Sequence, residues 1–178
     1  MHALLILDFQ VGLFHGPHAP WQGAALLDRI NRLLAKAHAA EVPVLLARHV
    51  GPAGSPLDPA GTLTQLLPEL ALRGDEWVFE KQRPNAFHAT ALLEHLQGLG
   101  ASQLLVAGMK TQVCVDSTCR AARDLGVEVL LVADAHGCCD TPELPAERII
   151  AHHNATLGTA FCGLVTADAW CPEGPDIR

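Results

Sequence analysis

Short apolar runs alternate with longer amphipathic segments along most of the chain. The apolar runs are largely aliphatic and lack a regular polar position at every second residue, which is typical of strands buried on both faces of a sheet. The predicted strands are Ala3–Leu7, Pro43–His49, Trp77–Phe79, Gln103–Ala107, Glu128–Asp134 and Ala160–Thr166.

Four of the five segments between these strands have helical spacing, and two of the helices end at a glycine, whereas the second strand is followed by a Gly/Pro-rich loop from Val50 to Gly61. The predicted helices are Leu26–Ala37, Ala89–Gln97, Val115–Leu125 and Pro145–Leu157. Strands that alternate with helices indicate a parallel sheet covered by helices on both faces. We therefore expect α/β architecture: a single three-layer α/β/α, Rossmann-like domain over residues 1–178, with a frayed tail at 172–178.

Residues that can carry chemistry follow three of the predicted strands. In an open parallel sheet, ligands bind beyond the carboxyl ends of the strands, near the point where the strand order reverses. Asp8 follows the first strand, Lys81 comes after the third, and Cys114 follows the fourth. If the first and fourth strands are neighbours, the three side chains face one crevice.

The three side chains form a coherent chemical set. A cysteine at a helix N-terminus with a lysine nearby is expected to favour its thiolate form. A carboxylate beside it can take or return a proton. Each residue alone also fits an ordinary structural role: Cys114 as a buried thiol, Lys81 as a solvated strand end, and Asp8 as a cap. Their shared location favours catalysis.

These residues lie in segments that resemble the isochorismatase-like family of cysteine hydrolases, which includes nicotinamidases and N-carbamoylsarcosine amidases. The resemblance covers nearly the whole chain in the right order. The segments that carry it are Leu5–Gln10, Phe79–Lys81 with Phe87, Ala107–Val115, Thr118–Asp134 and His152–Trp170. The resemblance implies a six-stranded parallel sheet and a catalytic triad of Asp8, Lys81 and Cys114.

By that resemblance, Cys114 attacks an amide-type carbon, Asp8 takes its proton, and Lys81 holds the two groups in place electrostatically. The backbone N–H groups of Lys110 and Cys114 are the implied oxyanion hole, a kind of site that contributes several kcal/mol to catalysis. A cis peptide bond is implied at Met109–Lys110.

Two departures from relatives narrow the expected substrate. Nicotinamidases carry an Asp-x-His metal cluster after the second strand, whereas this chain reads Arg48-His49-Val50-Gly51, and Asp58 lacks the spacing. We therefore expect no metal, no cofactor and no nicotinamidase activity. Isochorismatases that cleave an enol ether need no cysteine at the position of Cys114, so its presence favours hydrolysis of a carbon–nitrogen bond.

Further residues are predicted to bind substrate, with alternatives left open. For the aromatic residues among them the alternative is packing in the core, and for the histidine it is a plain strand end. The predicted substrate-binding residues are Phe14, Trp21, His49 and Phe87. Cys138 and Cys139 follow the fifth strand, where both a crevice and an interface are compatible with the sequence.

Composition limits the partners. The 178 residues are 49% hydrophobic with a formal net charge of −7 and no basic run, so neither nucleic acid nor membrane is expected as a partner. No signal peptide and no C-x-x-C pair are evident among the six cysteines, which favours reduced thiols and a cytoplasmic location. We expect a small-molecule substrate and, by the resemblance, a homodimer or homotetramer.

Other protein classes fit less well. A dinucleotide-binding protein needs a G-x-G-x-x-G turn after the first strand, and the chain reads Asp8-Phe9-Gln10-Val11-Gly12 there. The G-x-S-x-G turn of serine hydrolases is absent. A catalytically silent family member that binds a ligand or partner remains an alternative, as do an isochorismatase-type ether hydrolase and a thiol-redox protein.

Overall fold

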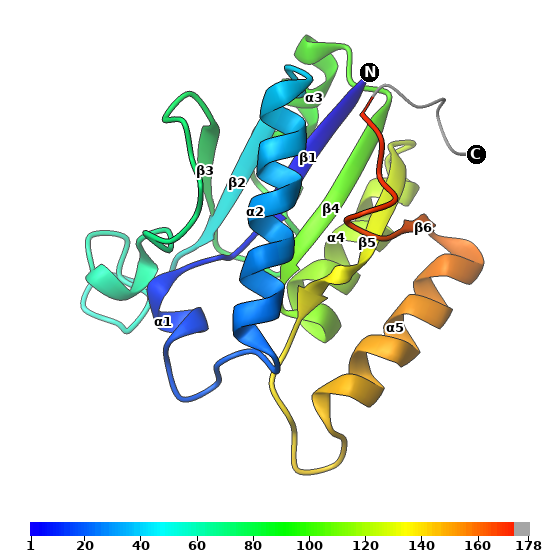
Figure 1. The fold of residues 1–178 in the computed structure, drawn as a ribbon. Coiled ribbons are helices and arrows are strands. Elements are labelled where there is room, and N and C mark those ends of the chain that lie inside the picture. Colours follow the sequence, from blue (N-terminus) through cyan, green and yellow to red (C-terminus); the bar gives the residue numbers. More distant parts are fainter. Residues whose placement is uncertain (173–178) are drawn as a thin grey trace.

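The computed structural model describes residues 1–172 and contains one parallel sheet (Figure 1). The six strands lie in the order β3-β2-β1-β4-β5-β6. Their bounds are β1 His2–Leu7, β2 Val44–His49, β3 Trp77–Lys81, β4 Gln103–Met109, β5 Glu128–Gly137 and β6 Gly163–Val165. Strands β1 and β4 are neighbours, so the strand order reverses between them. The predicted six-stranded parallel sheet and its reversal point are both confirmed.

Helices cover both faces of this sheet (Figure 1). Helix α2 packs on one face, and α3, α4 and α5 contribute to the apolar cluster on the other. The bounds are α1 Val11–Phe14, α2 Gly23–Ala39, α3 Leu92–Leu99, α4 Asp116–Asp124 and α5 Ala146–Ala160, with short turns at Thr62–Thr64 and Thr111–Val115. The three-layer architecture is therefore confirmed. Among residues 1–172, no helix is both long and apolar enough to cross a membrane.

Residues Ala3–Leu7 of strand β1 show why the central strands are largely aliphatic. All of its residues are buried. Leu4 and Ile6 belong to the cluster on the α2 side, whereas Leu5 and Leu7 belong to the cluster on the opposite side. Full burial of a leucine or isoleucine side chain stabilises the folded state by roughly 1.5–3 kcal/mol. A polar residue on either face of β1 would forfeit that contribution.

The ends of several elements differ from the sequence prediction. Strand β6 is shorter than predicted, because α5 continues through Ala160 and Phe161 packs its side chain against the core instead of extending a strand. Strand β3 is longer and includes Lys81 as its last residue. The predicted tail at 172–178 lies, apart from Pro172, outside the described residues.

Gly108 brings the carboxyl ends of β1 and β4 unusually close together. Its φ is +119°, and a Cβ atom there would lie 2.3 Å from the carbonyl oxygen of Leu7. Only glycine fits this close approach without moving one of the strands. The approach places the segment after β4 directly beside Asp8, which itself has a left-handed backbone with φ 56°.

Candidate active site

The structure brings the three predicted catalytic side chains together at the carboxyl edge of the sheet. Asp8 follows β1, Lys81 ends β3, and Cys114 lies in a π-helical turn between β4 and α4. The Lys81 Nζ atom is 2.9 Å from Asp8 Oδ2 and 3.3 Å from Cys114 Sγ. All three side chains are buried, with Asp8 and Lys81 each 1% exposed.

Asp8 keeps unused hydrogen-bonding capacity despite its burial. Within residues 1–172 its carboxylate pairs with Lys81 and lies within hydrogen-bonding reach of the Cys114 thiol, and no backbone N–H group donates to it. The Lys81 ammonium has three further acceptors around it: His49 Nδ1 at 2.9 Å, the Arg83 carbonyl at 3.2 Å and Cys114 Sγ at 3.3 Å. The Asp8 carboxylate therefore keeps lone pairs available beside the Cys114 thiol, as a proton acceptor requires.

The surroundings of Cys114 favour its thiol form. Burial, followed by the negative charge of Asp8, raises the pKa of Cys114 to about 12, and the opposing charge of Lys81 only partly offsets this. This corrects the expectation of a stabilised thiolate. Desolvation opposes the charged form of any buried group, and the nearest carboxylate acts in the same direction. A thiol in these surroundings needs a proton acceptor before it can act as a nucleophile, and Asp8 is the adjacent carboxylate.

His49 contacts the same ammonium from the end of β2. Its burial and the positive charge of Lys81 lower the pKa of His49, so the ring is neutral near pH 7. Its Nδ1 accepts from Lys81 and lies 4.0 Å from Cys114 Sγ. The buried amide of Gln10 fixes the backbone of His49 from both sides, accepting its N–H at 2.8 Å and donating to its C=O at 3.0 Å.

Sequence reasoning missed Gln10 as a supporting residue. It is fully buried, and it also donates to the Thr64 carbonyl at 2.9 Å. The available signal was a polar side chain three residues beyond the largely aliphatic strand β1 and two positions after Asp8. A buried amide needs partners for all its polar atoms, and the loop backbone supplies them here.

The turn that carries Cys114 is tied together by its own backbone. The Lys110 carbonyl accepts hydrogen bonds from the N–H groups of Val113 and Val115 at 3.1 and 3.2 Å. The Met109–Lys110 peptide bond is cis, as the resemblance implied. π-Helical turns are rare and occur mostly at functional sites.

A second buried network supports this turn from beneath. Asn154 donates to the Ala133 carbonyl and accepts from His136 Nε2 at 2.8 Å, which leaves His136 Nδ1 to accept from the Thr111 hydroxyl at 3.0 Å. Burial lowers the pKa of His136 to about 4, so the ring is neutral near pH 7. Sequence reasoning did not identify this network, because its members come from three separated elements.

A cavity of about 180 Å³ opens over Cys114, which is small beside the roughly 300–1,000 Å³ of ordinary ligand pockets. Its lining combines catalytic residues with aliphatic ones. The lining residues are Asp8, Leu13, His49, Leu57, Lys110, Val113 and Cys114. We refer to it as the carboxyl-edge cavity. Sequence reasoning missed Leu13, Leu57 and Val113, because loop conformation alone brings them together.

Of the predicted substrate-binding residues, His49 lines this cavity and the three aromatic residues do not. Phe14 is buried in the core on the α2 side, with its ring centroid 5.5 Å from that of Phe9. Trp21 lines a separate hollow that includes His136, and Phe87 packs against the apolar cluster on the opposite side.

The cysteines outside the site differ in their surroundings. All six cysteines are free thiols. Cys138 is buried near the start of α5, whereas the Sγ atom of Cys139 is 3.9 Å from Lys110 Nζ, beside the catalytic turn. Cys119 is fully buried in the core, consistent with a packing role.

The site contains donor atoms that a metal ion could use. Ligand atoms of Asp8, His49 and Cys114 lie within 4.8 Å of one another. The Lys81 Nζ atom, however, contacts all three, at distances of 2.9, 2.9 and 3.3 Å. The ammonium already places a positive charge among these donors, so the residues present do not fit a bound metal.

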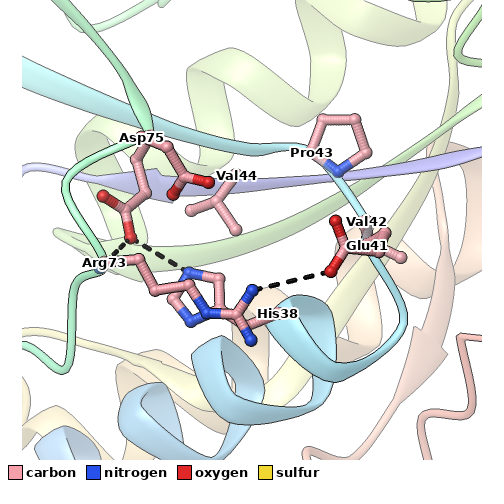
Figure 2. Close-up of a pocket in the computed structure, with 8 residues that line it drawn as sticks. His38, Glu41, Val42, Pro43, Val44, Arg73 and Asp75 are labelled. Carbon is pink, nitrogen blue, oxygen red and sulfur yellow. Dashed lines mark hydrogen bonds and ion pairs between the residues drawn. The ribbon is translucent and has the colours of Figure 1, made fainter.

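A second cluster of charged groups lies at the opposite, amino edge of the sheet (Figure 2). His38 near the end of α2 pairs with Glu76 at 3.0 Å, beside a cavity of about 120 Å³ that precedes β2 and β3. The Glu76 carboxylate also accepts the backbone N–H groups of Arg73 at 2.6 Å and Gly74 at 2.8 Å. We refer to this group as the amino-edge cluster. It contains no cysteine, and its carboxylate is saturated.

Comparisons with known proteins place the chain among hydrolases. Residues 2–162 match the family of the isochorismatase domain. The chain is 32% identical over 165 residues to the secreted isochorismatase effector Isc1 of Verticillium dahliae, covering 92% of this chain and 87% of that protein. It is 32% identical over 145 residues to a streptothricin hydrolase of Streptomyces noursei, covering 82% of this chain but only 52% of that protein.

A solved structure agrees with this assignment. The isochorismatase from Pseudomonas putida superposes with a TM-score of 0.87 at 32% identity, covering 94% of this chain and 88% of that one. One relative is named as secreted, so the cytoplasmic location of this chain stays a prediction. From the domain match, these identities and the shared fold, the chain belongs to the isochorismatase-like hydrolase family.

Proposed function

We propose that this protein is a cysteine hydrolase that cleaves a carbon–nitrogen bond in a small amide, ureido or carbamoyl compound. The observation that carries the proposal is the contact set around Lys81, whose ammonium lies 2.9 Å from Asp8 Oδ2 and 3.3 Å from Cys114 Sγ. A buried nucleophile, a carboxylate with free lone pairs and a fixed positive charge are the parts that covalent acyl transfer requires.

The first half-reaction transfers the acyl group to the enzyme. Asp8 takes the proton of the Cys114 thiol as Sγ bonds to the carbonyl carbon, and the carbonyl oxygen becomes an oxyanion. The C–N bond then breaks, and the nitrogen leaves with the proton held by Asp8. The products of this step are an amine or ammonia and a thioester on Cys114.

The second half-reaction returns the enzyme to its starting state. Asp8 takes a proton from a water molecule whose oxygen bonds to the thioester carbon. The C–S bond breaks, and Cys114 recovers a proton from Asp8 as the acid product leaves. Throughout, Lys81 keeps a positive charge beside whichever of the two groups is anionic, which lowers the energy of each charged state.

The oxyanion needs donors that do not move. We assign this role to the backbone N–H groups of Lys110 and Cys114, which belong to the turn that the Lys110 carbonyl closes with Val113 and Val115. Fixed donors of this kind typically contribute about 3–4 kcal/mol to transition-state stabilisation. A side-chain change at Lys110 should therefore affect turnover far less than a change at Cys114.

A thiol nucleophile is the reason to favour a C–N bond over an enol ether. A sulfur atom can form and release an acyl bond, whereas protonation of a vinyl ether requires only an acid. The test is ammonia release from a panel of small amides, ureido acids and carbamoyl compounds, with Cys114→Ala as the control. Release that persists in Cys114→Ala would refute the proposal.

A further inference from the structure

Three aliphatic side chains line the carboxyl-edge cavity, beside the four residues with polar side chains, Asp8, His49, Lys110 and Cys114. Leu13 from α1, Leu57 from the loop after β2 and Val113 from the catalytic turn face the space over Cys114. Almost all of the surface that they and their neighbours expose to the cavity comes from apolar atoms. A substrate group that lies against this wall gains hydrophobic contact but finds no side-chain hydrogen-bonding partner there.

The cations near the cavity are committed elsewhere. Lys110 lines it, but its Nζ donates to the His18 carbonyl at 3.2 Å and lies 3.9 Å from Cys139 Sγ. The side chain therefore presents its methylene stem. Lys81 is ion-paired with Asp8, so the pair adds no net charge to the site.

Two arginines lie in the same region and do not line the cavity. Arg48 donates to the carbonyls of Thr64 and Pro59, each at 2.9 Å, and pairs with Glu80 at 3.3 Å. Arg83 lines a neighbouring hollow together with Glu80, whose charge opposes its own. Within the described residues, no uncommitted cation lines the carboxyl-edge cavity.

We propose that the cavity selects small uncharged amides with an apolar substituent and rejects substrates that carry a second, carboxylate group. The inference rests on the proposed function and narrows its substrate class. A carboxylate placed against Leu13, Leu57 and Val113 would lose its water without gaining a counter-charge, and it would also lie near the anionic Asp8. An alkyl group of the same size incurs neither penalty.

The experiment compares butyramide with succinamic acid, which differ in having a methyl or a carboxylate group at the end of the same chain. We measure kcat/KM from ammonia release, and separately the protection of Cys114 against iodoacetamide. We expect butyramide to be preferred by about 100-fold or more in kcat/KM, and to be the better protecting ligand, because the acid must bury an unpaired charge.

Two lysine variants sharpen the comparison. Leu57→Lys places a cation at the cavity wall and should raise kcat/KM for succinamic acid at least about tenfold while lowering it for butyramide. Leu63→Lys makes the same charge change at a residue that is 50% exposed and outside the lining, so it should leave the preference unchanged.

The outcomes separate the two proposals. Equal or better use of succinamic acid, equal or better protection by it, or no protection by butyramide would overturn the inference. If the native protein prefers succinamic acid and Arg83→Gln does not, Arg83 in the neighbouring hollow supplies the counter-charge, and this result would also overturn the inference. If neither compound is hydrolysed by the native protein but butyramide alone protects Cys114, the inference stands and the proposed hydrolysis of simple amides fails.

Discussion

Two buried carboxylates at opposite edges of the same sheet have opposite surroundings. Asp8 at the carboxyl edge and Glu76 at the amino edge have side chains only 1% and 3% exposed. Glu76 accepts two backbone N–H groups and pairs with His38. Asp8 accepts no backbone N–H group within residues 1–172, and its side-chain partners are Lys81 and the Cys114 thiol.

In the proposed mechanism, this difference separates a structural carboxylate from a reactive one. Burial tends to raise the pKa of Glu76, but the N–H groups of Arg73 and Gly74 and the charge of His38 lower it overall. A saturated anion of this kind holds its loop in place and has little tendency to accept a proton. Asp8 keeps free lone pairs beside a thiol, so it can accept one. The two edges of this sheet therefore differ in how many fixed donors surround a buried carboxylate.

The largest expected effect comes from Asp8→Asn. The amide cannot accept the Cys114 proton, so kcat on a hydrolysed amide should fall by roughly 10²–10⁴-fold, the usual contribution of a general base. Steady-state ammonia release measures it. The matched change at the other edge, Glu76→Gln, should leave kcat within about twofold, since Glu76 touches no reacting group. Equal losses in the two variants would remove the distinction between the edges.

Asp8→Asn also leaves the Lys81 ammonium buried without its counter-charge. The double variant Asp8→Asn/Lys81→Met removes both charges and should recover stability while remaining inactive. Recovery of turnover in the double variant would show that the loss came from unfolding rather than from the missing base.

Lys81→Met should reduce both stability and turnover. It leaves Asp8 as an unpaired buried anion, a change that typically costs about 3–5 kcal/mol. Because Lys81 lowers the pKa of Cys114, its removal should also raise that pKa further. Urea unfolding gives the stability, with Lys110→Met as the matched control, because Lys110 has no acidic partner among its described contacts. If Lys81→Met lowers the free energy of unfolding no more than Lys110→Met does, the buried ion pair between Lys81 and Asp8 does not stabilise the fold.

His136 resembles Glu76 in being buried with hydrogen-bond partners for its polar atoms. We therefore expect its titration to change the stability of the fold. Its pKa is lowered by burial from 6.5 to about 4, so the unfolded chain takes up a proton first as the pH falls. The associated stability is complete above pH 6.5 and is lost between pH 6.5 and about 4. The loss amounts to up to ~3 kcal/mol for one group.

Urea unfolding between pH 7 and 4.5 measures this dependence. His136→Gln removes the titrating ring, so the slope of stability against pH should be shallower in the variant than in the native protein. Parallel slopes in the two proteins would show that His136 does not change its protonation on unfolding.

The smallest expected effect is at the amino edge. Glu76→Gln weakens the hydrogen bonds to the backbone of Arg73 and Gly74 and removes the charge opposite His38, at a cost of about 1–2 kcal/mol. Asp75→Asn, an exposed neighbour, should stay within about 0.5 kcal/mol of the native protein. Thermal unfolding of both variants measures the difference, and an equal response would mean that the Glu76 contacts are not stabilising.

The same contrast explains what the sequence could predict. Strands such as β1 are buried on both faces, so their aliphatic runs are visible in the sequence, and the parallel order follows from the helices between them. Asp8, Lys81 and Cys114 lie at or just after the carboxyl ends of three strands, so the parallel order predicts that they meet at one edge of the sheet.

Other features depend on tertiary packing that no local pattern reports. The apolar wall combines Leu13, Leu57 and Val113 from three separate segments. The pKa of Cys114 is raised by burial and by the charge of Asp8, and each of these effects is larger than the lowering by Lys81. The sequence shows that a lysine is present, but it does not show how deeply the thiol is buried. Phe14 is a further case: its place in an early loop allowed either a substrate wall or core packing, and in the structure α1 places it in the core.

The most direct test of the account is a trapped acyl group. The native protein is mixed with p-nitrophenyl acetate, an uncharged activated ester, quenched in acid during turnover, and digested for peptide mass analysis. We predict one acetyl group on the peptide that contains Cys114, no such adduct in Cys114→Ala, and slower acetylation in Asp8→Asn. Acetylation at another residue, or ester turnover that is unchanged in Cys114→Ala, would contradict the assignment of Cys114 as the nucleophile.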